Sequence, residues 1–592
     1  MANSEAELLL SLPPNMNRHL SECEPAVAAS AFGTCDPPGR PLGSGGGTAH
    51  VLAEAWKSQG QGRSFQAWLA DRRKIIIHGG GQSRRLPAYA GPGKLFIPVP
   101  AYRWSLGQRL DQSLLDLQLP FAQDVVSKAG AQARVAIVSG DVLLRSEVSI
   151  PSLPDADVVL LGLWARPEEA QHFGVMFCDR TDPSRLRFFL QKPSPDRIRE
   201  LAAENLFMID VGLWLLSERA VMCLMDKCGW NSEQQDFRTG QADTYDLYGA
   251  WGPHFGEHPD DPDSDVGKLT TAVVTIPEGA FYHFGKSRDI IRSVYDLQNL
   301  VVDQTRFGRP GTQPHPRQFV QNADFGFPLR QDSNHSLWVE NSMVPASWKL
   351  GSEHVLTGVP DNDWELELPS GVCLDFSPIG ESDYAVRPYG IDDPFRGAMG
   401  DAATPWLGSP IGEWLRKRDL TLAQAGLAED CDIQDAPLFP VLTGSPVSAD
   451  FVRWMCADEP DASPECRAQW LDASRLSATE IARDVNLVRL YAARRARMRD
   501  AVLAMAGNYR RSVFYRLDLE HAASLLAEHD DGLAALPVLT RGDSATMRMH
   551  DRMLRAQVMQ LQCRHEESAA FEREAFECLR DAIVTPVMEA ST

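Results

Sequence analysis

Short apolar runs alternate with stretches of helical periodicity up to about residue 310. The clearest apolar runs cover residues 74–78, 133–139, 157–163 and 272–276. Such alternation predicts a mostly parallel sheet covered by helices. Ligands on sheets of this kind bind beyond the carboxyl ends of the strands, and glycine-rich segments follow at such places here. The sequence therefore predicts an α/β domain over residues 1–310.

The pattern changes between Arg317 and Arg396. Apolar runs begin at Leu337, Val355 and Val372, so their starts lie 17 to 18 residues apart, and polar or glycine-bearing turns separate them. This spacing favours the coils of a β-solenoid, in which each coil stacks on the next. An ordinary antiparallel sheet is the alternative. We predict a β-solenoid-like domain and a connector over residues 311–445.

The last part of the chain, residues 446–592, is predicted to be helical. Ser477–Glu480 has the pattern of a capping box, and apolar residues follow it at helical spacing. Four arginines form a cluster on the helix that follows: Arg494, Arg495, Arg497 and Arg499. Such a cluster can bind an anionic partner. More often it is a solvated helix face whose arginines pair with acids.

Composition excludes several classes of protein. The 592 residues hold 80 acidic and 58 basic side chains, a formal charge of -22, which is the reverse of what a nucleic-acid binder needs. An anionic substrate must therefore meet local basic residues. The 11 cysteines are scattered without a CxxC pair, as in reduced cytoplasmic proteins. No run approaches the ~20 apolar residues of a membrane span, and the start of the chain lacks a signal-peptide pattern. We expect a cytoplasmic protein; the oligomeric state is not indicated.

The most informative segment joins an apolar strand to three glycines, Gly79, Gly80 and Gly81. Glycines let backbone N–H groups approach phosphates closely. Arg84 and Arg85 follow and suit bidentate phosphate contacts, and Lys94 adds a point charge. The string contains neither the Walker A pattern nor GxGxxG, so it predicts a phosphate-binding loop of another kind.

This string resembles the signature of the sugar-nucleotide pyrophosphorylases, and within them the fucose-1-phosphate guanylyltransferase family, which includes the guanylyltransferase part of bifunctional fucokinase/guanylyltransferases. Further segments are similar to that family, among them Leu42–Thr48, Phe281–Gly285, Trp338–Ser342 and Arg387–Phe395. The resemblance spans roughly residues 8 to 400. It implies a Rossmann-like nucleotidyltransferase domain that uses Mg²⁺ and transfers GMP from GTP to fucose 1-phosphate.

The resemblance also implies roles for the nucleotide-binding residues. Gly79, Gly80 and Gly81 would cradle the triphosphate, and either Arg84 or Arg85 would hold its outer phosphates. Lys94 would stabilise charge at the reacting phosphorus. A second glycine loop would lie against the base or ribose, with Gly45, Gly46 and Gly47 at its centre.

The remaining roles concern the metal and the sugar. Asp141, after an apolar strand and a glycine, would hold Mg²⁺; a turn residue is the alternative. Lys192 would anchor the sugar phosphate, and Asp210 a sugar hydroxyl. His283 stands where many relatives of the wider family carry a metal-binding aspartate, although the fucose-type group has histidine there, so the second metal ligand is unassigned.

Two other functions stay open. One is the same reaction with another sugar 1-phosphate or another nucleotide. The other is a non-catalytic regulator that binds nucleotide sugars, which His283 and Lys286 motivate. No glycine- and serine-rich sugar-kinase loop follows residue 400, so this chain is not expected to phosphorylate free fucose.

Overall fold

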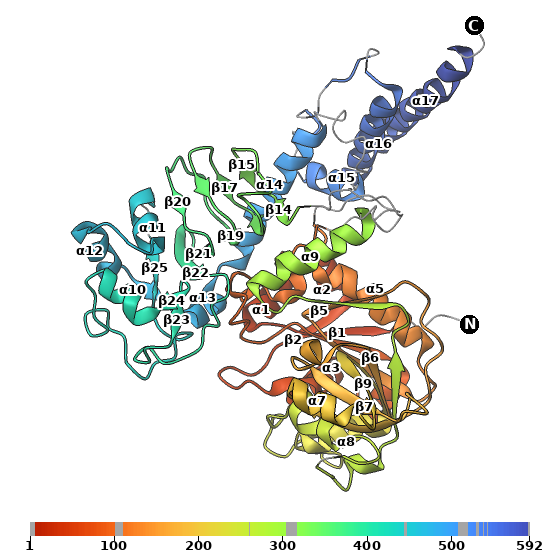
Figure 1. Ribbon diagram of the computed structural model, residues 1–592. Coiled ribbons are helices and arrows are strands. Elements are labelled where there is room, and N and C mark those ends of the chain that lie inside the picture. The colour runs from red at the N-terminus through yellow and green to blue at the C-terminus, as the bar shows by residue number, and fades with distance from the viewer. Residues whose placement is uncertain are drawn as a thin grey trace. The chain divides into compact units, whose positions relative to one another are not determined.

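A computed structural model gives the fold for residues 6–100, 111–259, 261–302, 316–442, 447–506, 519–528, 532–534, 536, 538–540 and 543–589 (Figure 1). The chain divides into two compact units. The first unit comprises Met1–Ile97, Ser113–Ile290 and Ala478–Leu487, and the second comprises Pro98–Gln112, Ile291–Ser477 and Val488–Thr592. The predicted domain limits at residues 310 and 445 lie outside the described residues, so the division into three domains stays a prediction.

A nine-stranded sheet forms the centre of the first unit, in the order β12-β6-β9-β4-β3-β1-β2, with β7 and β8 joined beside β9. Its strands are β1 (Glu7–Ser11), β2 (Ala31–Thr34), β3 (Lys74–His78), β4 (Ala133–Ser139), β6 (Val158–Leu163), β7 (Gly174–Cys178), β8 (Leu186–Gln191), β9 (Leu206–Ser217) and β12 (Thr271–Thr275). The four apolar runs chosen from the sequence are therefore strands of this sheet.

The predicted α/β architecture is present, but the sheet is mixed. Strands β2, β1, β3 and β4 are parallel neighbours, and so are β12 and β6. Strand β9 runs antiparallel to β4, β6 and β7. Apolar runs show that a strand is buried on both faces, but they do not encode its direction.

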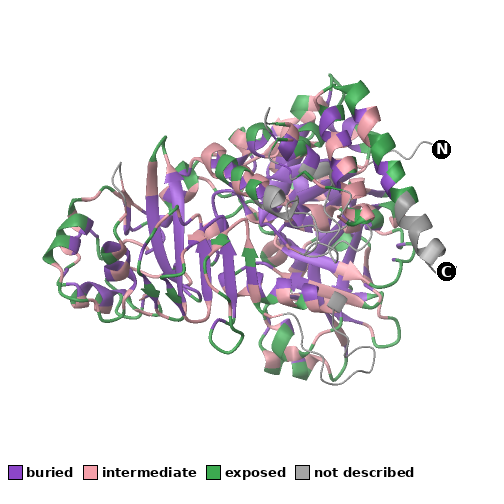
Figure 2. Cartoon of the chain, turned by 90° about the horizontal axis from the view of Figure 1, so that it is seen from above, coloured by how far each residue is buried: buried purple, intermediate pink, exposed green. Residues whose placement is uncertain are grey.

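Helices cover this sheet, and its strands are largely buried (Figure 2). Ile75, Ile76 and Ile77 of β3 are each 0% exposed, which explains their unbroken apolar run. The helices of the first unit are α1 (Pro14–Cys23), α2 (Pro25–Ser30), α3 (Gly43–Gln59), α4 (Phe65–Asp71), α5 (Leu114–Lys128), α6 (Pro167–Ala170), α7 (Pro195–Leu201), α8 (Glu218–Lys227) and α13 (Ala478–Asp484); α9 (Ser287–Val302) begins in this unit. A separate ribbon pairs β5 (Val142–Ser146) with β13 (Gly279–His283).

Parallel strands also organise the second unit. β14 (Gln318–Gln321), β16 (Leu337–Glu340), β19 (His354–Thr357) and β21 (Val372–Ile379) pair in parallel, and paired residues lie 17 to 19 positions apart. Two shorter parallel pairs accompany them, β15 (Asp324–Phe325) with β17 (Met343–Val344) and β18 (Lys349–Leu350) with β20 (Glu367–Leu368). Antiparallel pairing begins only at β22 (Asp383–Gly390), β25 (Phe439–Leu442) and β26 (Arg475–Leu476).

Helices make up much of the second unit after the parallel strands. Its helices are α10 (Ile411–Lys417), α11 (Ala449–Cys456), α12 (Pro464–Asp472), α14 (Leu487–Ala506), α15 (Leu519–Ala527), α16 (Ala545–Leu561) and α17 (His565–Glu589). Arginines of α14 pair with acids: Arg494 bonds Glu340 at 2.9 Å, and Arg497 bonds Asp324 and Asp361. Within the described ranges, no helix combines the length and apolarity that crossing a bilayer requires.

Candidate functional site

The candidate site begins where three parallel strands of the first unit end side by side. Ser11 of β1 pairs with His78 of β3, and His78 pairs with Ser139 of β4, so the three carboxyl ends are level. Gly79 follows His78 directly, and Asp141 follows Ser139 after one residue. This register brings the predicted phosphate loop and the predicted metal ligand to one edge of the sheet, where ligands of α/β sheets bind.

The three glycines after β3 differ in what they can contact. The N–H of Gly79 donates to the carbonyl of Ser11 at 2.8 Å, and a Cβ on Gly79 would lie 2.5 Å from Cδ1 of Leu95. Gly79 is therefore a packing residue whose amide is already bonded. Gly80 and Gly81 are exposed, and Gly81 has a φ of 116°, which favours glycine. Their contact with phosphates stays a prediction.

Lys94 and Asp141 form an ion pair at this edge. Lys94 begins the 3-10 helix η2 (Lys94–Phe96), and its Nζ lies 2.8 Å from Oδ2 of Asp141. The side chains are 14% and 26% exposed. The hydroxyl of Ser139 donates to Oδ1 of Asp141 at 3.0 Å. Burial opposes ionisation of Asp141, but Lys94 and His283 outweigh it and hold the pKa of this carboxyl well below its usual range.

His283 joins this pair through the β5–β13 ribbon. His283 pairs with Val142, the residue after Asp141, so its ring lies beside that carboxylate. Nε2 is 3.7 Å from Oδ2 of Asp141, and Nδ1 is 3.0 Å from Oδ2 of Asp289. Burial opposes the charged form, but the two carboxylates outweigh it and raise the pKa of His283 to about 9.

Asp289 is a residue of this cluster that the sequence did not predict. It lies in the first turn of α9, two residues after Ser287, whose N–H donates to the carbonyl of Arg85 at 2.9 Å. An acid in the first turn of a helix is common, because it interacts favourably with the helix dipole. Only the pairing of β5 with β13, two strands from distant parts of the sequence, gives Asp289 its place beside His283 and Asp141.

Asp210 lies on β9, next to β4, and is 5% exposed. Its Oδ1 accepts hydrogen bonds from the N–H of Gly212 at 3.0 Å and from Nε1 of Trp214 at 2.9 Å. Burial raises the pKa of Asp210 to about 7, and these two bonds only partly offset it. Asp210 is therefore a tightly held buried carboxyl, and its contact with a sugar hydroxyl stays a prediction.

The other predicted basic residues follow β3 and β8. Arg84 donates from Nε to the side chain of Gln82 at 2.8 Å, and Arg85 is exposed. Lys192, also exposed, follows β8 with a φ of 50°, and its N–H donates to the carbonyl of Phe173 at 3.0 Å. Their roles toward the two phosphate groups stay predictions.

The second glycine segment is a helix start, so its predicted loop conformation over Gly43–Thr48 is wrong, while its contact with the base or ribose stays a prediction. Helix α3 begins at Gly43, and the N–H groups of Gly45 and Gly46 donate to the carbonyl of Tyr245 at 2.9 and 3.0 Å. A Cβ on Gly46 would overlap the carbonyl of Asp243. These glycines let the 243–245 backbone lie against the helix. Gly47 differs from them, since a Cβ there would lie 3.6 Å from the ring of His78 at the end of β3.

Asp141 is the carboxylate that the sequence predicts for the metal. In the part of the chain that the structure describes, no three His, Cys, Asp or Glu side chains are grouped to hold a metal ion. Mg²⁺ is often bound by one or two carboxylates together with substrate phosphates and water. Asp141 fits that mode as one oxygen donor, provided that the ammonium of Lys94 moves from it to a phosphate.

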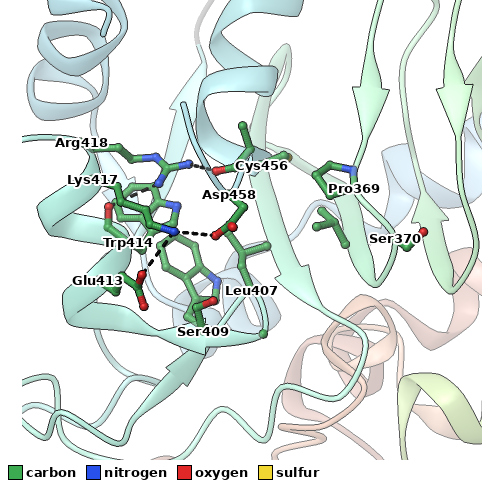
Figure 3. Close-up of a pocket in the computed structure, with 14 residues that line it drawn as sticks. Pro369, Ser370, Leu407, Ser409, Glu413, Trp414, Lys417, Arg418, Cys456 and Asp458 are labelled. Atoms are coloured by element: carbon green, nitrogen blue, oxygen red, sulfur yellow. Dashed lines mark hydrogen bonds and ion pairs between the residues drawn. The ribbon is translucent and has the colours of Figure 1, made fainter. Parts of the chain in front are cut away.

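A cavity of about 300 Å³ lies in the second unit, among α10, α11 and the turn after β23 (Pro405–Trp406) (Figure 3). Its charged groups bond one another or the backbone. Nζ of Lys417 lies within 3.3 Å of carboxylates of Glu413, Asp458 and Glu459. The guanidinium of Arg418 donates to the carbonyls of Trp454 and Ala457. The charges of Lys417 and Arg418 are therefore balanced or hydrogen-bonded within the protein. We assign no ligand to the cavity.

A comparison with protein families matches a part of the first unit that contains most of the candidate site. Residues 67–245 match the family model described as the fucose pyrophosphorylase domain. This range includes the Gly79–Gly81 turn, Lys94, Asp141, Lys192 and Asp210. The chain is also 42% identical over 580 residues to a Bacteroides fragilis protein named L-fucokinase/L-fucose-1-P guanylyltransferase. The alignment covers 97% of this chain and 59% of that protein.

One solved structure is a distant neighbour. It is titled as a mannose-1-phosphate geranyltransferase from Thermus thermophilus. It is 13% identical with a TM-score of 0.29, and the overlap covers 65% of this chain and 80% of that one. Nothing about the activity of this chain follows from so low a score.

Proposed function

We propose, on the premise that residues 67–245 form a fucose pyrophosphorylase domain, that the chain transfers GMP from GTP to L-fucose 1-phosphate. A phosphate oxygen of the sugar 1-phosphate attacks the α-phosphorus of GTP. The bond from that phosphorus to the bridging oxygen breaks, and the products are GDP-L-fucose and pyrophosphate. The name of the 42% identical relative supports this reaction, although the chain spans only 59% of that protein's length.

The observation that carries the proposal is the position of the Lys94–Asp141 pair, at the same sheet edge as the exposed Gly80–Gly81 turn. Phosphoryl transfer depends on positioning and on neutralising charge more than on proton transfer. Lys94 would leave Asp141 for the phosphate under attack, because the oxygens of that phosphate carry charge that an ammonium stabilises. Gly80 and Gly81 would donate N–H groups to the outer phosphates, with Arg84 or Arg85 beside them.

Asp141 would hold Mg²⁺ together with the phosphates of the nucleotide. The ion, when bound, supplies positive charge that neutralises the phosphate oxygens around the reacting phosphorus. The carboxylate of Asp141 is ionised and has one oxygen held by Ser139, which fixes its plane. Lys192 and Asp210 would bind the phosphate and a hydroxyl of the sugar.

Two further features belong to the proposal. The parallel rows of β14, β16, β19 and β21, with partners 17 to 19 residues apart, support a β-solenoid in the second unit. The scattered cysteines of the sequence support the cytoplasm as the compartment.

A grid assay tests the reaction. The pure chain is incubated with Mg²⁺, one of several nucleoside triphosphates and one of several sugar 1-phosphates, and pyrophosphate release is measured. We expect the highest kcat/KM with GTP and fucose 1-phosphate. A higher value for another pair would replace the substrates and keep the reaction. Binding of GDP-fucose without pyrophosphate release from any pair would overturn the reaction and favour the non-catalytic regulator.

A further inference from the structure

Four side chains of the first unit form a continuous chain of polar contacts: Lys94, Asp141, His283 and Asp289. Nζ of Lys94 is 2.8 Å from Oδ2 of Asp141, and Nε2 of His283 is 3.7 Å from the same oxygen. Nδ1 of His283 is 3.0 Å from Oδ2 of Asp289. All four side chains are between 14% and 29% exposed, so the row is partly shielded from solvent. Lys94 and Asp289 are the two ends of this row.

The ring of His283 is packed on several sides. It stacks on Phe281 at an interplanar angle of 10°, and Phe173 meets it edge-on at 87°. Gly285 closes another side, because a Cβ at that position would overlap the imidazole. The N–H of Phe284 donates to the carbonyl of Asp141 at 2.8 Å and ties the end of β13 to the turn after β4. These contacts set the plane of the ring. Within that plane, Nδ1 lies toward the carboxylate of Asp289 and Nε2 toward the carboxylate of Asp141.

We propose that Asp289 is a positioning residue, which holds His283 so that Nε2 faces Asp141 and fixes that carboxylate for the metal–nucleotide complex. The proposal rests on the proposed function for the meaning of Asp141. Nδ1 of His283 and Oδ2 of Asp289 share a hydrogen bond of 3.0 Å, which holds the ring with Nε2 toward Oδ2 of Asp141. Partners of this outer kind orient the groups that bind a metal, and their loss costs about 10- to 100-fold in affinity or activity.

The competing explanation is that Asp289 only stabilises the start of α9, where an acid interacts favourably with the helix dipole. Two measurements on three variants separate the two roles. Asp289→Asn removes the charge and keeps the size, and Asp289→Glu keeps the charge. Asp296→Asn removes a carboxylate from the same helix, where its partner is Arg292 at 3.9 Å.

Steady-state kinetics is the first measurement. We expect Asp289→Asn to lower kcat about 10- to 100-fold, to raise the Mg²⁺ concentration needed for half-maximal rate, and to leave the KM for fucose 1-phosphate within about threefold. Asp289→Glu should recover part of the loss, and Asp296→Asn should behave as wild type. A kcat of Asp289→Asn within about twofold of an active wild type would overturn the proposal, as would equal losses in Asp289→Asn and Asp296→Asn.

The second measurement does not need turnover. Diethyl pyrocarbonate modifies histidine rings whose nitrogens are free, and peptide mapping by mass spectrometry reads each histidine separately. We expect His283 to be modified several times faster in Asp289→Asn than in wild type, with His50 unchanged as the internal reference. An unchanged rate at His283 would overturn the proposal. If the wild-type chain releases no pyrophosphate at all, the proposed function fails, and this mapping alone decides whether Asp289 holds the ring.

Discussion

Nζ of Lys94 lies 2.8 Å from Oδ2 of Asp141, so the predicted phosphate-binding lysine and the predicted metal ligand neutralise each other in the free protein. They come from segments 47 positions apart, and the parallel pairing of β3 with β4 brings them together. A resting ion pair of this kind keeps two half-buried charges compensated until substrate arrives. In the proposed reaction each partner has a different role, and substitutions separate the two roles.

Replacing Lys94 with Ala should lower kcat by about 10²–10³, because one preorganised positive charge at the reacting phosphorus is lost. The fold should persist, since Ser139 and His283 still contact Asp141. Pyrophosphate release and circular dichroism measure the two effects. Lys268→Ala is the control, because Lys268 is an exposed lysine paired with Asp265 at 3.0 Å. An unchanged kcat in folded Lys94→Ala would remove Lys94 from the mechanism.

Asp141→Asn should reduce activity by at least about 10²-fold and should raise the Mg²⁺ concentration that the enzyme needs. Asn keeps the size and removes the charge that attracts the cation. Nucleotide affinity in the absence of Mg²⁺ should be equal or higher, because Lys94 is released from its partner and one negative charge near the phosphates is gone. A Mg²⁺ titration of the rate checks the assignment, with Asp265→Asn as the matched surface variant. A wild-type Mg²⁺ response would leave Asp141 as a turn residue.

The sequence predicted those features that depend on local pattern. The run at residues 74–78 is β3 and the run at 133–139 is β4, with the same limits, because each strand is largely buried and bounded by polar turns. Strand β9 was not predicted to be antiparallel, since side-chain burial is alike in both directions. The glycines at 43–47 were assigned to a loop, because the sequence does not distinguish a glycine needed for close packing from one needed for flexibility.

Local patterns could predict those residues of the candidate site that follow a strand, whereas Lys94 and His283 were named through the family resemblance. The Gly79–Gly81 turn and Asp141 follow the apolar runs of β3 and β4, and both the glycine signature and the apolar runs are local patterns. Asp289 was missed, since its place beside His283 depends on the β5–β13 ribbon, which brings His283 to Asp141, and on the start of α9 just after β13. Contacts of this sort come from tertiary packing, and the spacing of residues along the chain does not predict them.

The packing role of the glycines in α3 leads to a prediction about stability. Gly46→Ala should destabilise the first unit by about 1–3 kcal/mol, because the new methyl group overlaps the backbone carbonyl of Asp243, which cannot move as a flexible side chain would. Gly412→Ala in α10 is the control: its Cβ meets nothing within 4 Å, and Ala in a helix is more favourable than Gly. Urea unfolding compares the two. Equal midpoints for Gly46→Ala and wild type would show that the contact is dispensable.

Asp210 gives the protein a pH-dependent term in its free energy of unfolding. Burial raises the pKa of Asp210 in the folded protein to about 7, and an unfolded aspartate has a pKa of about 3.9. Between these two values the folded state binds the proton more tightly than the unfolded state does. This contribution to stability is therefore fully present below about pH 4 and is lost as the pH rises toward about 7.

Asp210→Asn should remove this dependence and keep the local hydrogen bonds, because the amide oxygen of Asn can accept from the N–H of Gly212 and from Nε1 of Trp214. We expect the variant to match the wild type in stability near pH 4 and to exceed it near pH 8, by at most about 4 kcal/mol for a shift of about three pKa units. Urea unfolding of both proteins across this range measures the difference. Asp196→Asn, whose side chain is 96% exposed, should show no such divergence. Parallel curves for Asp210→Asn and wild type would mean that Asp210 is ionised in the folded protein, and that the two donors around it compensate the cost of its burial.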